Sequence, residues 1–282
     1  ANGDAPIFNS DELPNPRLYF GFNHTEDSEM MAHYNTDGVL CPHCQSILHY
    51  KSITYSNLGK YYCPKCDFKR PELNYAVTAL NELSLTGSSF DIDGTTFSIP
   101  IAGLYNIYNA LAAYSAAKFF GLSTEEIQEG FSKAQRVFGR QETFAVEDKE
   151  VMLNLIKNPV GFNQIVQLLS YEKEPFSLGV LLNDNPADGQ DVSWIWDGDF
   201  EGLHALNAVD TAISGIRVED LGVRMEVAGF ENIKVFKTNA ELIDWIRKAP
   251  TKKVNVLATY TALLDLRKDF AKEGYLKEGM NG

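Results

Sequence analysis

FSLGVLLNDNPADGQDVSWIWDGDFE, residues 176–201, joins an apolar run to a loop rich in carboxylates. The run Phe176–Leu182 predicts a buried strand, because it is apolar and ends at a turn signal. Turn formers and acids follow it, among them Asp184, Asp188 and Asp191. In an open α/β sheet, ligands bind beyond the carboxyl ends of the strands, so this loop is a candidate functional site. Alternatively, these aspartates only cap a turn or the helix that follows.

The chain on both sides of this loop alternates apolar strands with helical segments. We expect further strands at Val151–Ile156, Ala208–Ile213, Ile233–Phe236 and Val254–Ala258, with helices between them such as Asn163–Ser170 and Ala240–Lys248. Strands and helices that alternate at this spacing predict an α/β fold with a parallel, doubly wound, Rossmann-like sheet.

Length and charge limit the classes of function. A chain of 282 residues with 44% hydrophobic residues can bury a sizeable core and is long enough for two domains. Its net charge of −13 argues against non-specific nucleic-acid binding and against docking to anionic lipid by charge alone. The sequence contains no apolar run of about 18 residues and begins with no signal peptide, so we expect no transmembrane segment and a cytoplasmic protein.

All four cysteines of the chain occur in two CxxC pairs. Two thiolates separated by two residues can bind the same ion, and the residues between the two pairs alternate as in a hairpin. The pattern therefore predicts a structural zinc ribbon inserted at about residues 34–71. Its ligands would be Cys41, Cys44, Cys63 and Cys66. Disulfides or redox-active pairs are the alternatives. His43 and His49 are possible extra ligands, but a closed site takes four ligands, so we expect both histidines at the surface.

A helix rich in small residues is expected at Ile101–Phe120. Asn106 and Asn109 lie three residues apart near its start and therefore share a face. A carboxamide offers a donor and an acceptor side by side, which suits the edge of a purine. Alternatively, Asn106 is a cap and Asn109 a buried hydrogen-bonding residue. The segment Arg136–Glu142 follows the next helix and is a candidate domain joint.

Several of these motifs together resemble one family. They are ANGDAP (1–6), GLYNIYNALAA (103–113), GRQE (139–142), KNPVGFNQ (157–164) and DNPADGQDVSWIWD (184–197). In combination with the four cysteines they resemble the Mur ligase family, and within it the MurT-like branch. The resemblance covers nearly the whole chain. It implies that residues 1–140 are part of a Mur ligase central domain carrying the ribbon, and that residues 141–282 are the C-terminal domain.

The resemblance also implies a reaction. Members of this branch use ATP and magnesium to activate the α-carboxyl of D-glutamate in the stem peptide of lipid II, at the inner face of the membrane. Ammonia from a separate GatD-like glutaminase subunit then attacks the acyl phosphate and gives D-isoglutamine. By the same resemblance, Asn106 and Asn109 read adenine, Arg140 holds ribose or phosphate, and Lys157 is a weaker phosphate ligand. Asp191 would orient the catalytic histidine of the glutaminase, with Asp188 in reserve.

One motif of the family does not occur in these 282 residues. The P-loop GxxxxGK(S/T), which cradles nucleotide phosphates, is missing, so we expect it and the magnesium ligands upstream. Two other functions remain open: a Mur-type amino-acid ligase that needs no glutaminase, and a non-catalytic zinc-ribbon adaptor. The chain has no cysteine outside the ribbon, so it cannot itself be the glutaminase.

Overall fold

The computed structural model describes residues 1–9, 15–25, 30–31, 40–134, 141–206 and 208–276. The chain divides into two compact units, residues 1–135 and residues 136–282. We call them the N-terminal unit and the C-terminal unit. Sequence analysis placed the boundary after residue 140. In the described part of the chain, no helix combines the length and the apolar character needed to cross a bilayer.

The N-terminal unit contains a four-stranded sheet in the order β1-β5-β6-β7. The strands are β1 (Phe20–Phe22), β5 (Tyr75–Leu83), β6 (Ser88–Ile92) and β7 (Thr95–Ile99). β1 runs parallel to β5, and the other pairs are antiparallel. Asp93 and Gly94 form the turn that joins β6 to β7, and both residues have positive φ, as a tight hairpin turn requires.

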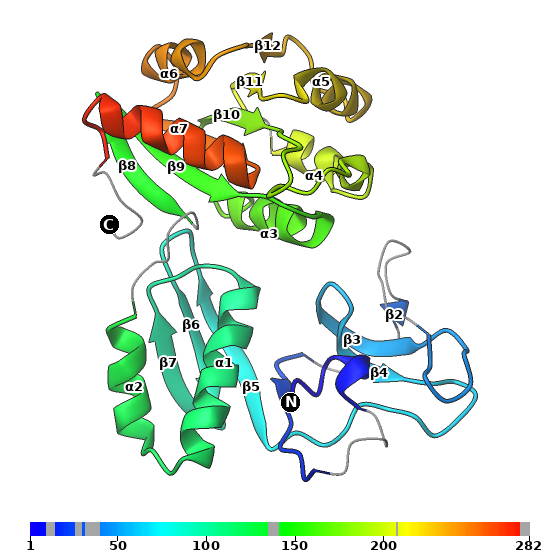
Figure 1. Ribbon diagram of the computed structural model, residues 1–282. Helices are drawn as coiled ribbons and strands as arrows, with labels where there is room; N and C mark the ends of the chain where they lie inside the picture. Colours follow the sequence, from blue (N-terminus) through cyan, green and yellow to red (C-terminus); the bar gives the residue numbers. More distant parts are fainter. Residues whose placement is uncertain (10–14, 26–29, 32–39, 135–140, 207, 277–282) are drawn as a thin grey trace. The chain divides into compact units, whose positions relative to one another are not determined.

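Two helices and a short 3-10 turn complete this part of the N-terminal unit. They are α1 (Leu104–Phe119), α2 (Thr124–Ser132) and η1 (Pro6–Phe8), and α1 and α2 pack against the sheet (Figure 1). α2 begins at a capping box, in which Ser123 and Glu126 satisfy each other's backbone N–H groups. The capping box fixes where this helix starts.

The cysteine-bearing insertion forms a second, antiparallel sheet in the order β2-β3-β4. Its strands are β2 (Met30–Met31), β3 (His49–Tyr55) and β4 (Leu58–Tyr62). A small core of its own contains Cys41, Leu48, Tyr50, Tyr61, Cys63 and Phe68. A core this small buries little apolar area, so such a module needs a further source of stability, such as a bound metal ion or a disulfide.

A buried ion pair joins the insertion to the host sheet. Arg70, where the chain leaves the insertion, lies 2.8 Å from the fully buried carboxylate of Asp4. Asp4 also accepts hydrogen bonds from the Tyr108 hydroxyl and the Phe22 N–H, both at 2.8 Å. The charge of Asp4 is therefore balanced and solvated by protein groups, as burial of a carboxylate requires.

The C-terminal unit is built on a six-stranded sheet in the order β12-β11-β10-β13-β9-β8. The strands are β8 (Glu142–Val146), β9 (Lys149–Leu155), β10 (Phe176–Leu181), β11 (Asp210–Ser214), β12 (Lys234–Val235) and β13 (Lys253–Ala258). All neighbours are parallel except β8, which pairs antiparallel with β9. The expected parallel sheet thus carries one antiparallel edge strand that the sequence did not indicate.

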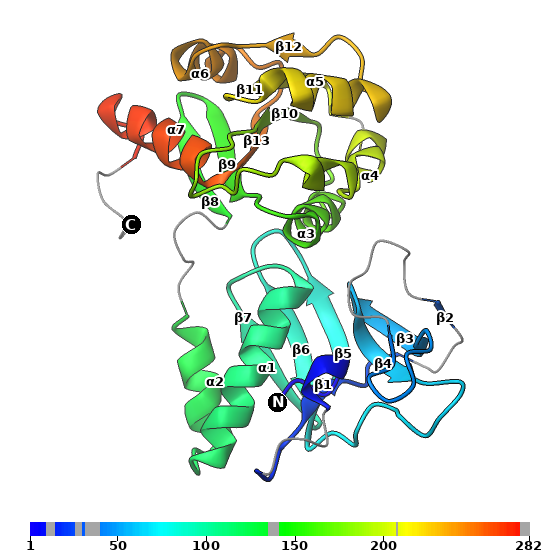
Figure 2. The same cartoon turned by 45° about the vertical axis from the view of Figure 1, so that its right-hand side comes forward.

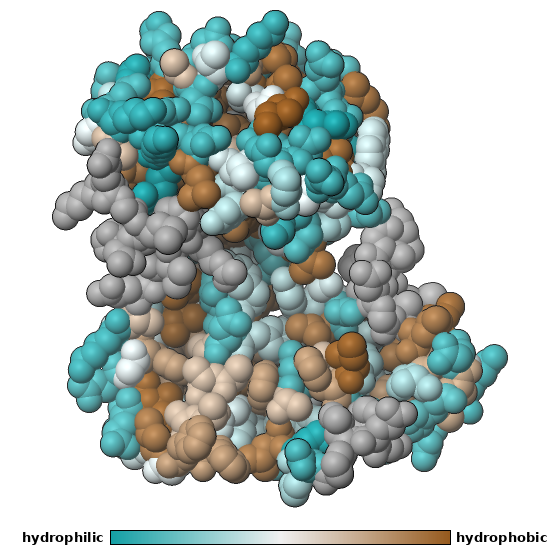
Figure 3. Space-filling view, viewed as in Figure 1, coloured by the Kyte–Doolittle hydropathy of each residue, from teal (hydrophilic) through white to brown (hydrophobic). Residues whose placement is uncertain are grey.

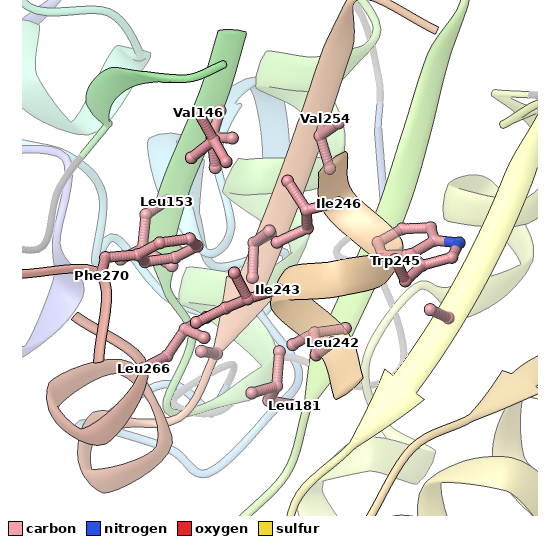
Figure 4. Packing of buried hydrophobic residues seen from close by; sticks show 14 of the residues in the cluster. Val146, Leu153, Leu181, Leu242, Ile243, Trp245, Ile246, Val254, Leu266 and Phe270 are labelled. Atoms are coloured by element: carbon pink, nitrogen blue, oxygen red, sulfur yellow. The ribbon is translucent and has the colours of Figure 1, made fainter. Parts of the chain in front are cut away.

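Helices cover both faces of this sheet (Figures 1 and 2). They are α3 (Pro159–Leu169), α4 (Phe200–Ala205), α5 (Val218–Val227), α6 (Asn239–Arg247) and α7 (Tyr260–Lys272), with the 3-10 turn η2 at Ser193–Trp196. α6 and α7 pack on one face through a core that includes Leu153, Ile243, Val256 and Phe270, part of which is drawn in Figure 4. In Figure 3, the visible surface of the C-terminal unit is mostly hydrophilic, in keeping with the polar composition of its exposed residues.

Candidate active site

The acidic loop lies at the carboxyl edge of the C-terminal sheet, directly after β10. Asn183 ties this loop to the ends of both neighbouring strands: its N–H donates to Thr259 Oγ1 after β13, and its Oδ1 accepts from the Ile216 N–H after β11 (2.8 and 2.9 Å). Asn183 is itself buried. The loop is therefore fixed from both sides at the place where doubly wound sheets bind ligands.

Asp188 is held inside the loop as a structural carboxylate. It is 5% exposed. Its Oδ1 accepts from the Thr261 N–H at 2.7 Å, and its Oδ2 accepts from Thr261 Oγ1 at 2.5 Å and from the Asn185 N–H at 3.1 Å. Both carboxylate oxygens are thus occupied by bonds that connect the loop to the start of α7.

Asp191 lies at the surface of the same loop. One of its oxygens accepts the Ser193 N–H at 2.8 Å, so Asp191 forms an Asx turn that leads into η2, whose N-cap is Val192. This local role is close to the capping role of the structural alternative. Hydrogen bonds from Ser193 hold the pKa of Asp191 below its ordinary value. The carboxylate is therefore ionised, oriented by this turn and accessible, whereas that of Asp188 is enclosed.

A buried arginine supports the segment between Asp191 and α4. Arg224 of α5 is 3% exposed and donates to the carbonyls of Ile195 and Gly198 at 2.9 and 3.0 Å. It also binds both carboxylate oxygens of Glu201, at 2.8 and 2.7 Å. Asp220 and Arg224 lie four residues apart on α5, a spacing that would suit an ion pair, but Asp220 pairs with Arg217. Arg224 instead points inward under the loop.

The two tryptophans of the loop differ in exposure. Trp194 is partly buried, with its ring 6.2 Å from that of Phe162. Trp196 is 52% exposed and is stacked by the Arg224 guanidinium, 5.5 Å from its ring centroid. Trp196 is therefore not part of the core, and its indole lies at the surface beside the acidic loop.

Lys157 follows β9 at the same carboxyl edge and is exposed. The next residue, Asn158, caps α3 by accepting the Gly161 N–H at 2.8 Å. In the sheet order, β13 separates β9 from β10. Lys157 and Asp191 thus belong to one edge of the sheet, although they are not adjacent along it.

The asparagine pair of α1 is in contact, as the spacing of three residues predicts. The Asn109 amide donates to Asn106 Oδ1 at 3.4 Å, and the Asn106 amide donates to the Ala102 carbonyl at 2.7 Å. Asn106 is 8% exposed, whereas Asn109 lies at the surface. Asn106 is therefore a positioning residue within the fold, and Asn109 presents the accessible amide. Arg140 falls outside the described residues.

The four cysteines converge in the insertion. Their sulfur atoms all lie within 4.8 Å of one another, and the Sγ atoms of Cys41 and Cys66, and of Cys44 and Cys63, are 3.5 Å apart. Disulfide sulfurs would lie about 2.05 Å apart. Tetrahedral bonds of about 2.3 Å to one zinc ion place sulfurs about 3.8 Å apart, close to the observed separation. The residues therefore fit a four-thiolate metal centre, and the disulfide alternative does not hold.

Other features of the insertion agree with such a centre. Hydrogen bonds from Ser46 lower the pKa of the Cys44 thiol to about 6, which favours the thiolate. Despite a hydrogen bond with the Phe68 backbone, burial and the neighbouring thiols raise the pKa of Cys66 to about 12, so Cys66 needs a bound cation to become a thiolate. His43 is exposed, with its ring 4.8 Å from that of Phe68. His49 packs its ring edge-on against Tyr62. His43 forms a second possible ligand group with Cys66 and Asp67, but four converging sulfurs leave a closed site no position for it.

Comparisons with known proteins point to one family. Residues 155–263 match the family model described as MurT ligase C-terminal. Over 99% of the chain, 46% of residues are identical to the lipid II isoglutaminyl synthase (glutamine-hydrolyzing) subunit MurT of Streptococcus pneumoniae strain ATCC BAA-255 / R6. The corresponding subunit of Staphylococcus aureus strain COL is 32% identical over 86% of the chain. The chain spans 63% and 56% of the lengths of these two relatives.

Solved structures show the same fold. A pseudomurein peptide ligase type C from Methanothermus fervidus superposes with a TM-score of 0.65 over 96% of this chain and 56% of its own length, at 21% identity. The UDP-N-acetylmuramate-alanine ligase of Thermotoga maritima superposes with a TM-score of 0.54 over 71% of this chain and 45% of its own, at 12% identity. At these identities the likeness establishes a Mur ligase-like α/β fold and nothing further.

Proposed function

We propose that this chain, which is similar to MurT subunits of the Mur ligase family, forms the synthetase part of a lipid II isoglutaminyl synthase. The reaction converts the α-carboxyl of D-glutamate in the stem peptide of lipid II to the amide of D-isoglutamine. A carboxylate is a poor electrophile until one oxygen becomes a phosphate leaving group, so ATP first forms the acyl phosphate. The observation that carries this proposal is the 46% identity to a MurT subunit over nearly the whole chain.

A partner subunit would supply the ammonia. Free ammonia is protonated at neutral pH, and an acyl phosphate is hydrolysed by water, so the two must meet in a site that excludes solvent. We propose a GatD-like glutaminase as this partner. The exposed Trp196 beside the acidic loop supports a docking surface there, because exposed aromatic side chains are common anchors of interfaces.

Asp191 would complete the catalytic machinery of that glutaminase by orienting its histidine. A nucleophilic cysteine needs an imidazole, and the imidazole needs a carboxylate that holds its tautomer and stabilises its positive charge. The accessible and ionised carboxylate of Asp191 supports this role. Asp188 remains the reserve, but its burial and its three hydrogen bonds make it the weaker candidate.

ATP and magnesium would be bound only in part by this chain. Asn109 would contact the adenine edge, with Asn106 holding its amide in place, and Arg140 would hold ribose or phosphate. Lys157 would act as a further phosphate ligand. A zinc ion held by Cys41, Cys44, Cys63 and Cys66 would stabilise the insertion as a ribbon, and the C-terminal unit would be the Rossmann-like C-terminal domain.

Reconstitution with the partner tests the proposal. The complete protein and a GatD-like glutaminase are incubated with ATP and the lipid-linked acceptor, supplied with either glutamine or ammonium, and the amidated product is measured by mass spectrometry. We expect product from both nitrogen sources, with glutamine effective only when the glutaminase is present. An added amino-acid residue in place of the amide would indicate a Mur-type amino-acid ligase instead. If neither product forms and ATP does not bind, the chain belongs to a non-catalytic adaptor.

A further inference from the structure

A hollow lies where the cysteine-bearing insertion meets the host sheet of the N-terminal unit. Its volume is about 550 Å³, and it is lined from three directions. β3 and β4 of the insertion contribute one wall, the exit segment from Lys69 to Leu73 a second, and Asn23 and Thr25, which follow β1, a third. We call it the junction pocket.

The lining of the junction pocket is mostly basic, although the protein as a whole is acidic. Its described lining includes four basic side chains, Lys51, Lys60, Lys69 and Arg70, and one acidic side chain, Glu72. Residues 40–73 contain five basic and two acidic residues, whereas the complete chain carries a net charge of −13. A local reversal of sign inside a concave surface focuses the electrostatic potential and attracts anions.

The hairpin places two of these cations next to each other. Tyr50 pairs with Tyr61 across β3 and β4, and both rings are buried in the core of the insertion. Lys51 follows Tyr50 and Lys60 precedes Tyr61. The register shifts between Tyr50 and Ile53, so Lys51 and Lys60 lie on neighbouring strands at this irregularity, and both line the pocket. Like charges placed opposite each other on a sheet repel, and an anion between them relieves that repulsion. Both lysines also interact within the chain, so the inference uses their charge and not an unpaired donor.

Arg70 fixes the floor of the pocket. Its guanidinium binds Asp4 and the Phe22 carbonyl at 2.8 Å, and it donates to Asn23 Oδ1 at 2.6 Å. With the oxygen of Asn23 engaged in this bond, the amide nitrogen of Asn23 remains a donor for a ligand. Arg70 is therefore a scaffold for the site, and the other positive charges of the lining belong to the lysines.

We propose that the junction pocket binds a diphosphate group, and that the lipid-linked acceptor presents it. Two adjacent phosphates carry several negative charges and many acceptor oxygens, which suit three lysines and an amide donor better than a single carboxylate would. This assignment to the acceptor rests on the proposed function, because a lipid II-type acceptor carries a diphosphate between sugar and lipid. A nucleotide is the other source of the same chemistry. The pocket would then hold the acceptor, while the reacting carboxyl group lies elsewhere.

Two matched double variants of the complete, zinc-loaded protein test the proposal. Lys60→Gln with Lys69→Gln removes two charges from the pocket, and Lys237→Gln with Lys252→Gln removes two exposed charges from the C-terminal unit. Inorganic pyrophosphate is titrated into each protein by calorimetry. We expect the pocket variant to raise the Kd for pyrophosphate at least about tenfold, and the control to leave it within about twofold. Equal affinity in the pocket variant and the unmodified protein would overturn the proposal. Unchanged zinc content and melting temperature confirm that the variant is folded.

Steady-state kinetics of the complex identify the source of the diphosphate. If the acceptor presents it, the pocket variant raises the KM for the lipid-linked acceptor about tenfold and leaves kcat and the KM for ATP nearly unchanged. A rise in the KM for ATP alone would overturn the assignment to the acceptor. If the unmodified complex makes no amidated product from either nitrogen source, the proposed function fails, and the pyrophosphate titration still decides the pocket.

Discussion

Asp188 and Asp191 lie three residues apart in one loop, and the structure predicts opposite consequences for their replacement. Asp188→Ala removes three hydrogen bonds that a 5%-exposed carboxylate accepts, two of them from Thr261. Asp191→Asn keeps an oxygen that can accept the Ser193 N–H, because asparagine forms an Asx turn as aspartate does. The first change should therefore destabilise the C-terminal unit, and the second should not.

The size of the effect follows from the burial of the lost partners. The Thr261 N–H and hydroxyl would remain near the loop without their acceptor, and an unsatisfied buried polar group costs about 1–3 kcal/mol. We expect Asp188→Ala to lower the free energy of unfolding by about 3 kcal/mol in total. For a domain of this size, that corresponds to a decrease of roughly 6–12 °C in melting temperature. Asp191→Asn should change stability by no more than about 0.5 kcal/mol.

Tryptophan fluorescence can measure this difference in the complete chain. All three tryptophans, Trp194, Trp196 and Trp245, belong to the C-terminal unit, so their emission reports the unfolding of that unit alone. Urea titrations of the two variants and the unmodified protein give the free energies. Equal stability of Asp188→Ala and the unmodified protein would refute the structural role assigned to Asp188.

The functional half of the prediction uses Asp191→Asn and the matching Asp188→Asn in complex with the glutaminase. Asp191→Asn should abolish or greatly reduce synthesis from glutamine, because an amide cannot stabilise an imidazolium, while synthesis from added ammonium and association of the subunits survive. If instead Asp188→Asn loses glutamine hydrolysis and Asp191→Asn does not, the role belongs to Asp188. Normal glutamine hydrolysis in both would show that the loop is only a turn.

Three further predictions concern the metal, the nucleotide and pH. Elemental analysis should find one zinc per chain, and Cys63→Ser or chelation should unfold the insertion while tryptophan emission from the C-terminal unit is unchanged; protein purified without chelator and lacking zinc would contradict this. Asn109→Ala should weaken ATP use with little loss of stability, whereas Asn106→Ala should cost about 1–3 kcal/mol because its amide is buried; unchanged ATP kinetics in the first would leave the pair purely structural. Hydrogen bonds from Arg224 lower the pKa of Glu201 below 4.5, so their stabilisation is complete above that pH and is lost as the pH falls; melting temperatures of Glu201→Gln should therefore depend less on acid pH than those of the unmodified protein.

Local patterns in the sequence predicted most elements of the C-terminal unit. Apolar runs bounded by turn signals gave β9, β10 and β13 within a few residues of their observed ends, because a strand buried on both faces is continuously apolar. β8 was missed. It is a short edge strand in which partly buried and exposed positions alternate up to the buried Val146, and its pairing with β9 depends on a contact that no local pattern encodes. The strand expected at Ile233–Phe236 is observed only at Lys234–Val235, which is β12. It lies at the edge of the sheet, where very short strands are common.

The sequence predicted where the candidate site lies, but not which role each of its residues has. Turn formers and acids after an apolar strand indicated the loop. The enclosure of Asp188 depends on Thr261, which lies at the start of α7, more than seventy residues away in sequence. Likewise, helical spacing would suit an ion pair between Arg224 and Asp220, but Arg224 is buried and binds Glu201, 23 residues away. Long-range burial overrode a local rule that holds only for exposed helix faces.

A carboxylate that serves a partner's histidine must satisfy two physical demands that a single residue cannot meet. It must remain exposed and ionised so that the imidazolium can reach it, and it must be held to within a fraction of an ångström so that the hydrogen bond is oriented. In this loop, Asn183 and Asp188 are buried and bind the ends of β11 and α7, which removes the freedom of the loop backbone. Asp191 can then stay at the surface with one oxygen in the Asx turn before η2 and the other available. The rigidity of the site and its accessibility are thus supplied by different residues, which is why the perturbation of either should be measurable without the other.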